Sequence, residues 1–188
     1  GSQLMELITK KRLHLVAGRN NRALAEEVAQ RLSVELGHVS LSEFANGELH
    51  CKYGDSIRGA DVFIFQGHCS TSDMSINDAL MEQLIMVDAA RRASAKRITV
   101  VAPFYGYGRQ DRKAEGREPI TAKLVADMLV AAGADRSQRG EVGGESGDLY
   151  TPALFSDRLR IEFYLPPGLP AGQLPFDADN IQHLFRNP

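Results

Sequence analysis

Residues 60–104 read ADVFIFQGHCSTSDMSINDALMEQLIMVDAARRASAKRITVVAPF, and this stretch decides the fold class. Its two ends, residues 60–67 and 97–104, are nearly continuous apolar runs, which are typical of strands buried on both faces of a parallel sheet. Between them, residues 77–95 carry apolar side chains at helical spacing, namely Leu80, Leu84, Ile85 and Ala89. A strand, a helix and a second strand in this order predict a βαβ unit, in which the helix covers the sheet face that it crosses.

The same alternation continues on both sides of this unit. Residues 12–18, RLHLVAG, predict a short strand that ends in a glycine turn, and residues 21–36 follow with apolar positions at helical spacing. On the other side, Pro119 stands at a first-turn position of a second helix, which continues in good helix formers until Gly133. We therefore expect an α/β fold with a doubly wound, mainly parallel sheet.

The character of the chain changes after Arg136. Residues 137–148, SQRGEVGGESGD, are glycine-rich and charged, and they predict a flexible link. Residues 149–188 contain several prolines, which interrupt any long helix or central strand, so we expect an irregular, partly docked tail. The sequence thus predicts one domain at 12–136, preceded by an extension at 1–11 whose first two residues, Gly1 and Ser2, resemble a cloning remnant.

Composition excludes several classes of function. The 188 residues are 43% hydrophobic and 24% charged with a formal net charge of −2, which does not favour DNA, RNA or an acidic membrane surface as the main partner. No apolar run approaches the roughly 20 residues that span a bilayer. Cys51 and Cys69 form neither a zinc pattern nor a disulfide framework. We expect a cytoplasmic protein without a metal site of its own.

A charged loop follows the predicted strand at 97–104. The segment 103–123, PFYGYGRQDRKAEGREPITAK, places Arg109, Arg112, Lys113 and Arg117 near the carboxyl end of that strand. Ligands of open α/β sheets bind at this edge, and guanidinium and ammonium groups donate charge-assisted hydrogen bonds to phosphate oxygens. The pattern predicts a polyphosphate site, although a solvated charged loop without a ligand accounts for the same residues.

Two further segments are candidates for ligand binding. In SEFANGEL at 42–49, an extended backbone would place Phe44, Asn46 and Glu48 on one face, where a ring, an amide and a carboxylate suit a purine. The pair Asn46-Gly47 equally indicates an ordinary turn. In GDSIRG at 54–59, Ser56 and Arg58 have the chemistry to hold a small anion, and a surface turn is the alternative.

These segments occur together in one order. The chain contains EFANGE at 43–48, SIRGADVFIFQ at 56–66, NDALMEQLIMVDAARRASAKRITVVAPFYGYGRQDRK at 77–113, REPITAKLVADML at 117–129 and AGADR at 132–136. In this combination the chain resembles the amino-terminal domain of ribose-phosphate pyrophosphokinase, also called phosphoribosyl pyrophosphate synthetase, from about Arg12 to Arg136. The resemblance implies one of two similar α/β domains of the phosphoribosyltransferase-like kind.

The resemblance also implies an activity and a set of site residues. Members of the family use ATP and Mg²⁺ to convert ribose 5-phosphate to phosphoribosyl pyrophosphate and AMP. By similarity, Arg109 and Gln110, with Arg112 and Lys113 in the same loop, would contact ATP. Three residues, Phe44, Asn46 and Glu48, would hold the adenine of an ATP bound mainly by a neighbouring subunit, and Ser56 and Arg58 would bind a regulatory phosphate. A homo-oligomer is therefore expected, and no catalytic residue is assigned.

The pattern departs from the family after Arg136. Where the family has an apolar strand and an Asp-Leu-His motif with a metal-binding histidine, this chain has SQRGEVGGESG. The ribose 5-phosphate loop of the family is absent as well, so we expect a truncated chain that is inactive by itself. The alternatives are a non-catalytic assembly module that pairs with itself or with a full-length synthetase, and a frame-shifted or engineered tail without an evolved role.

Overall fold

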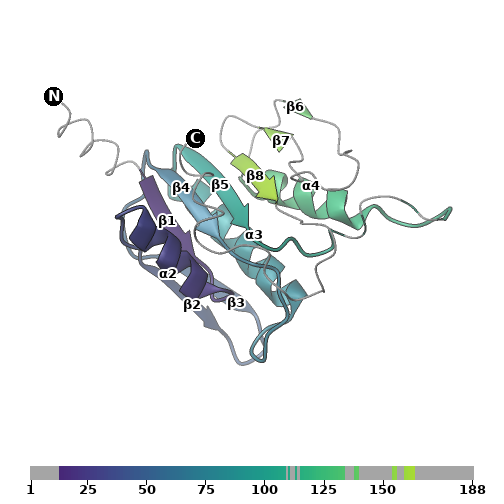
Figure 1. The fold of residues 1–188 in the computed structure, drawn as a ribbon, viewed down its shortest axis with the longest axis horizontal. Helices are drawn as coiled ribbons and strands as arrows, with labels where there is room; N and C mark the ends of the chain where they lie inside the picture. The colour runs from purple at the N-terminus through teal and green to yellow at the C-terminus, as the bar shows by residue number, and fades with distance from the viewer. Residues whose placement is uncertain are drawn as a thin grey trace.

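The computed structural model describes residues 13–108, 110, 113 and 115–133, and the backbone of 138–139, 154–155 and 159–163. In chain order the elements, shown in Figure 1, are β1 (Leu13–Ala17), α2 (Arg22–Arg31), β2 (Val39–Glu43), β3 (Leu49–Tyr53), β4 (Asp61–Phe65), α3 (Ile76–Arg92), β5 (Arg97–Ala102), α4 (Thr121–Gly133), β6 (Gln138–Arg139), β7 (Leu154–Phe155) and β8 (Leu159–Phe163). The predicted extension at 1–11 lies outside the described residues, as does most of the predicted link and tail.

The main sheet has the strand order β1-β4-β5-β8-β7-β6. Its first four strands are parallel, and the register runs from Leu13 through Asp61 to Arg97 in one row. The last two strands, β7 and β6, run antiparallel to their neighbours. The fold is therefore α/β with a mainly parallel sheet, which confirms the predicted fold class, and β8 pairs with β5 inside the segment for which a tail was predicted.

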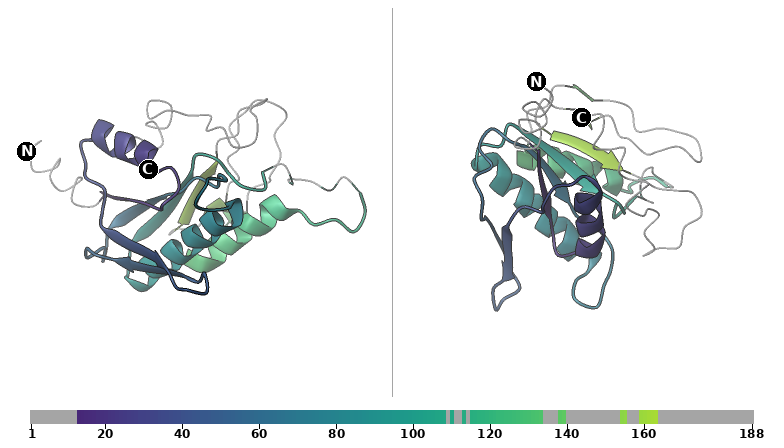
Figure 2. Two further views of the ribbon diagram at one scale, coloured as in Figure 1. Left: turned by 90° about the horizontal axis from the view of Figure 1, so that it is seen from below. Right: turned by 60° about the vertical axis from the view of Figure 1, so that its left-hand side comes forward.

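Helices cover both faces of the sheet because the strand side chains alternate between them. Leu15, Phe63 and Phe65 pack in one cluster with Ala25 and Val28 of α2. The next residues along the strands pack in a second cluster with α3 and α4, namely Val16, Val62, Ile64, Ile98 and Val100. Figure 2 shows α3 and α4 side by side on that second face. This two-sided burial explains the nearly continuous apolar runs of the central strands.

The antiparallel pair β2–β3 forms a separate hairpin beside α3. Half-buried Leu41, Cys51 and Tyr53 pack against the second core cluster, and the Tyr53 hydroxyl donates to the Met86 carbonyl of α3 at 3.0 Å. Burial raises the pKa of Tyr53 above its ordinary value. It also raises the pKa of the Cys51 thiol, which reaches about 11. The base of the hairpin is thus anchored to a helix, while its tip extends away from the core.

Helix α3 begins at Ile76, one residue before the predicted helical segment 77–95, and it buries a different stripe. Ser75 is the N-cap: its hydroxyl accepts from the Asp78 N–H and the Asp78 carboxylate accepts from the Ser75 N–H. The buried residues are Ala79, Leu80, Glu82, Gln83, Met86, Val87 and Ala90. Three members of the predicted stripe, Leu84, Ile85 and Ala89, are only half-buried. The predicted stripe was wrong because the polar residues Glu82 and Gln83 lie on the buried face. A search for apolar periodicity alone assigns such polar residues to the solvent-exposed face.

Candidate active site

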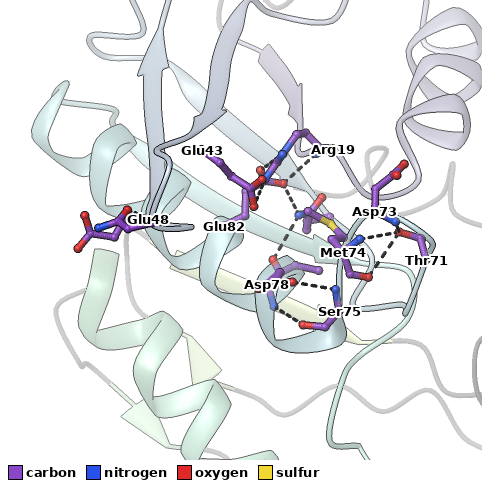
Figure 3. A network of polar contacts seen from close by, with 12 residues as sticks. Arg19, Glu43, Glu48, Thr71, Asp73, Met74, Ser75, Asp78 and Glu82 are labelled. Atoms are coloured by element: carbon purple, nitrogen blue, oxygen red, sulfur yellow. Dashed lines mark hydrogen bonds and ion pairs between the residues drawn. The ribbon is translucent and has the colours of Figure 1, made fainter.

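The carboxyl ends of β1, β4 and β5 meet at one edge of the sheet, because these strands are parallel neighbours. Three loops leave this edge, at residues 18–21, 66–75 and 103–120. This is the edge at which open α/β sheets bind ligands. The polar contacts that hold the first two loops to α3 are drawn in Figure 3.

A buried carboxylate of α3 is at the centre of these contacts. Glu82, only 2% exposed, accepts hydrogen bonds from the backbone N–H of Arg19 at 2.9 Å and from its Nε at 2.7 Å. The side-chain amide of Gln66 donates to the same carboxylate at 2.7 Å, and its Oε1 accepts from the Asn20 N–H at 3.0 Å. A buried charge is stable only when its oxygens are satisfied in this way. The turns after β1 and β4 are therefore both held to α3.

Arg19 connects this centre to the hairpin. Its guanidinium, 36% exposed as a side chain, lies 3.7 Å from the Glu43 carboxylate at the end of β2 (Figure 3). Burial lowers the pKa of Arg19, but the hydrogen bond and charge of Glu82, with a smaller contribution from Glu43, leave the pKa above its ordinary value. Arg19 thus stays charged, and the tip of the hairpin is kept at the carboxyl edge of the sheet.

The loop after β5 leads into α4 through Gln110. The backbone carbonyl of Gln110 accepts from the Ala122 N–H at 3.0 Å, and its Oε1 accepts from the Thr121 hydroxyl at 2.6 Å. Gln110 and Lys113 are both exposed. Lys113 and Arg117 of the predicted phosphate-binding cluster are exposed in the loop that follows β5, whereas Arg109 and Arg112 lie outside the described residues.

Residues 44–48 of the segment at 42–49 form the tip of the hairpin, where the chain reverses and is not extended. The Gly47 N–H donates to the Phe44 carbonyl and the Phe44 N–H donates to the Glu48 carbonyl, both at 2.8 Å, with Gly47 at φ 88°. This is a three-residue hairpin loop closed by a glycine bulge. The turn prediction is therefore confirmed, and the assumption that Phe44, Asn46 and Glu48 share one face of an extended strand was wrong. Pairing of β2 with β3 forces the chain to reverse at Asn46-Gly47.

The three tip residues nevertheless remain available to a ligand. All residues from Ser42 to Glu48 are exposed, and Phe44 is 57% exposed. The Phe44 ring meets the His50 ring edge-on at 5.9 Å. The Asn46 Oδ1 accepts from the Glu48 N–H at 3.1 Å, which fixes the turn and leaves the NH₂ group of Asn46 for another partner.

Ser56 and Arg58 lie at the opposite edge of the sheet. The intervening Ile57 is buried, its carbonyl accepts from the Ala60 N–H at 3.0 Å, and the Gly59 N–H donates to the Ser94 carbonyl at 2.9 Å, after the end of α3. Both Ser56 and Arg58 are exposed on this turn, which precedes β4. The structure therefore brings Gln110 and the hairpin tip to one edge and places Ser56 and Arg58 at the other.

Arg19, Gln66 and Glu82 were not among the predicted site residues. The signal was present for Glu82, since it lies three and four residues from Ala79 and Met86 on the buried face of α3. A carboxylate at such a position requires a partner, which the sequence does not name. Arg19 and Gln66 become its partners only because parallel strands bring residues 18–21 and 66–75 together.

Among the described residues, no group of three His, Cys, Asp or Glu side chains lies close enough to hold a metal ion. No helix in the described ranges is long and apolar enough to cross a membrane.

Comparison with known proteins relates this fold and its edge site to one family. The family model for the N-terminal domain of ribose phosphate pyrophosphokinase matches residues 13–133. The ribose-phosphate pyrophosphokinase of Streptomyces coelicolor is 52% identical over 127 residues, which are 68% of this chain and 38% of that protein. The enzyme of Bifidobacterium longum is 50% identical over 135 residues, 72% of this chain and 38% of that protein.

A solved structure agrees with these sequence matches. Phosphoribosylpyrophosphate synthetase from Mycobacterium smegmatis has a TM-score of 0.62 and 51% sequence identity, over 66% of this chain and 41% of that one. The chain thus spans about two fifths of the length of the relatives that it matches. Because the family model covers the whole α/β unit from β1 to α4, the chain belongs to the family of the N-terminal domain of ribose-phosphate pyrophosphokinase.

Proposed function

We propose that the chain binds ATP at the carboxyl edge of its sheet, as the nucleotide-binding half of a ribose-phosphate diphosphokinase site. The observation that carries this proposal is that Gln110, hydrogen-bonded to Thr121 at the start of α4, lies at this edge, where the Arg19–Glu43 contact also holds the end of β2. In the proposed reaction, ATP and ribose 5-phosphate give phosphoribosyl pyrophosphate and AMP, so polyphosphate recognition is the task that this edge must perform.

The two parts of the nucleotide would meet different groups. Exposed Lys113 and the amide of Gln110, with Arg109 and Arg112 of the same loop, would donate to phosphate oxygens and so neutralise charge that grows during the transfer. The Phe44 ring would stack on the adenine, and the side chains of Asn46 and Glu48 would form hydrogen bonds with its polar edge. Because the tip extends away from the core, we infer that it serves the ATP of a neighbouring subunit.

We propose further that the 188 residues alone do not complete the transfer. They match the N-terminal domain of longer relatives, over 38% of the length of the Streptomyces coelicolor enzyme, and the ribose 5-phosphate and metal sites would come from elsewhere. A cytoplasmic location fits this function, although the relatives include chloroplastic proteins of Oryza sativa and Arabidopsis thaliana.

Calorimetric titration of ATP with Mg²⁺ into the full chain tests the nucleotide half-site. We expect saturable binding that Arg109→Ala weakens roughly tenfold, because a charge-assisted hydrogen bond to phosphate contributes about 1.5–3 kcal/mol. Arg91→Ala is the matched control, since exposed Arg91 lies near the end of α3 at the other edge of the sheet. Absent binding at millimolar ATP, or equal weakening by both substitutions, would contradict the proposal.

A second function, an assembly module without catalysis, is favoured by the exposure of the hairpin tip. A phenylalanine that is 57% exposed at the end of a projecting hairpin suits a protein partner as well as an adenine. Light scattering of the chain, alone and mixed with a full-length relative, distinguishes the assembly module from the nucleotide half-site. Association that is abolished by Phe44→Asp, in a chain that does not bind ATP, would favour the assembly module. A chain that remains monomeric when the full-length relative is added would exclude it.

A further inference from the structure

His68 is a completely buried histidine that follows β4 and is not used in the site described above. Its Nδ1 accepts a hydrogen bond from the backbone N–H of Gly106 at 3.0 Å, and its Nε2 lies 2.6 Å from the Oε1 of Gln83. Gly106 belongs to the loop after β5, and Gln83 belongs to α3. The imidazole therefore bridges a helix and the loop that leads to Gln110.

The two partners determine the proton on the ring. The Gln83 NH₂ group donates to the Ile64 carbonyl at 3.2 Å, so its Oε1 faces His68 as an acceptor. Nε2 must therefore carry the hydrogen. Gly106 offers an N–H, which is always a donor, so Nδ1 must be bare. The contacts accept a single form of the ring, which is the neutral Nε2–H tautomer.

The loop segment held by His68 is strained and tightly packed. Tyr107, next to Gly106, adopts φ 66°, a left-handed conformation that costs a side-chain-bearing residue free energy. A Cβ on Gly106 would lie 2.7 Å from Ile76 and 2.9 Å from the Cβ of His68, so only glycine fits there. The Gln110 N–H then donates to the Tyr107 carbonyl at 2.9 Å. The position of Gln110 thus depends on the turn that His68 holds.

We propose that His68 is a positioning residue of the nucleotide site: its neutral ring holds the Gly106–Tyr107 turn, and through it Gln110, in the arrangement that meets phosphate. The nucleotide part of this inference rests on the proposed function. Protonation would place a second N–H against that of Gly106 and break the bridge.

Among the residues that the structure describes, few groups near the ring oppose or assist its protonation. Gln83 faces it from α3, the Tyr105 ring lies 5.7 Å away on the loop after β5, and the Cys69 thiol follows it in the chain. The neighbouring Glu82 carboxylate is bonded to Arg19 and Gln66. Burial depresses the pKa of His68 to about 4, while the hydrogen bond to Gln83 raises it slightly, so the ring is neutral near pH 7.

A pair of amide substitutions in the full chain separates the two ring nitrogens. In His68→Asn the side-chain oxygen replaces Nδ1 and can still accept from Gly106, whereas His68→Gln places its amide near the position of Nε2 and leaves Gly106 without an acceptor. We expect His68→Gln to increase hydrogen exchange of the Gly106 amide at least tenfold and to weaken ATP binding about tenfold. For His68→Asn we expect the exchange rate of the Gly106 amide and the affinity for ATP to stay within about threefold of those of the unsubstituted protein.

Nitrogen-15 NMR of the unsubstituted protein is the second measurement, and it needs neither nucleotide nor a variant. We expect the Nε2–H tautomer at pH 7 and loss of Gly106 protection when His68 becomes protonated. An Nδ1–H tautomer, or equal exchange at Gly106 in both variants, would overturn the positioning role. If the unsubstituted chain binds no ATP, the proposed function and the nucleotide part of this inference both fail, while exchange at Gly106 still decides whether His68 holds the turn.

Discussion

At the scale of single residues, the carboxyl edge depends on one buried carboxylate. Glu82 receives three hydrogen bonds, two from Arg19 and one from Gln66, and these join the turns after β1 and β4 to α3. Removal of one partner of a buried ion pair leaves polar groups desolvated without compensation, which is more costly than the net contribution of the pair. The stability of this edge is therefore concentrated in a single side chain.

We predict that Glu82→Ala lowers the free energy of unfolding by roughly 3 kcal/mol. Urea denaturation followed by circular dichroism measures this loss, and Glu27→Ala on the exposed face of α2 is the matched control, for which we expect less than about 0.5 kcal/mol. An effect of Glu82→Ala as small as that of the control would show that the hydrogen bonds from Arg19 and Gln66 to this carboxylate do not contribute to the free energy of unfolding.

His68 predicts an acid sensitivity with a defined sign. Its pKa falls from the ordinary value of 6.5 to about 4 on folding, because burial disfavours the imidazolium. The unfolded chain therefore binds more protons between these values, so stability is full above pH 6.5 and declines as the pH falls toward 4. Between pH 7.5 and 5 this residue alone should cost about 2 kcal/mol.

Urea midpoints at pH 7.5 and pH 5 test this expectation. The control variant is His68→Asn, which does not titrate and so removes this contribution while all carboxylates remain. A variant that loses as much stability on acidification as the unsubstituted protein would mean that His68 is not buried in its neutral form.

At the scale of elements, the β2–β3 hairpin is determined by one glycine. Gly47 has φ 88°, and a Cβ built on it would meet no atom within 4 Å, so a substitution there tests the backbone alone. We predict that Gly47→Ala destabilises the protein by about 1 kcal/mol, the cost of a left-handed conformation for alanine. Thermal unfolding measures the change.

Gly116 provides the control for this prediction. It is equally open to a Cβ, but its φ lies outside the left-handed range. We expect Gly116→Ala to be neutral or slightly stabilising, because alanine reduces the entropy of the unfolded chain. Equal effects at the two positions would indicate that the left-handed conformation at Gly47 does not determine the hairpin.

At the scale of the whole molecule, the chain matches one domain of longer relatives. Its described part contains the α/β unit and the projecting hairpin, and it matches about two fifths of the length of its relatives. We predict that the purified chain, given ATP, Mg²⁺ and ribose 5-phosphate, forms no phosphoribosyl pyrophosphate, since missing transition-state groups cost several kcal/mol each.

The assay is detection of AMP and of phosphoribosyl pyrophosphate by chromatography, with the Streptomyces coelicolor enzyme as the positive control. Steady formation of both products by the chain alone, at a rate proportional to its concentration, would contradict this prediction. It would also require ligands for the second substrate among residues outside the described ranges.

The sequence alone determined the α/β class and the positions of β1, β4, β5 and the helices that follow them, whereas β8 lies in the segment for which a tail was predicted. Apolar runs at 60–67 and 97–104 indicated strands buried on both faces, and the helical segments that alternate with them indicated that helices cover those faces. The turn at Asn46-Gly47 was equally predictable, since local hydrogen bonding decides it.

Tertiary structure decided which distant residues act together. Glu82 and His68 are separated in sequence from Arg19 and Gly106, and only the parallel pairing of β1, β4 and β5 brings them within hydrogen-bonding distance. The same pairing places Gln110 and the Arg19–Glu43 contact at one edge of the sheet and Arg58 at the other. Periodicity reports which face of an element is buried, but the partner of a buried polar group depends on the neighbouring strand, which no local pattern specifies.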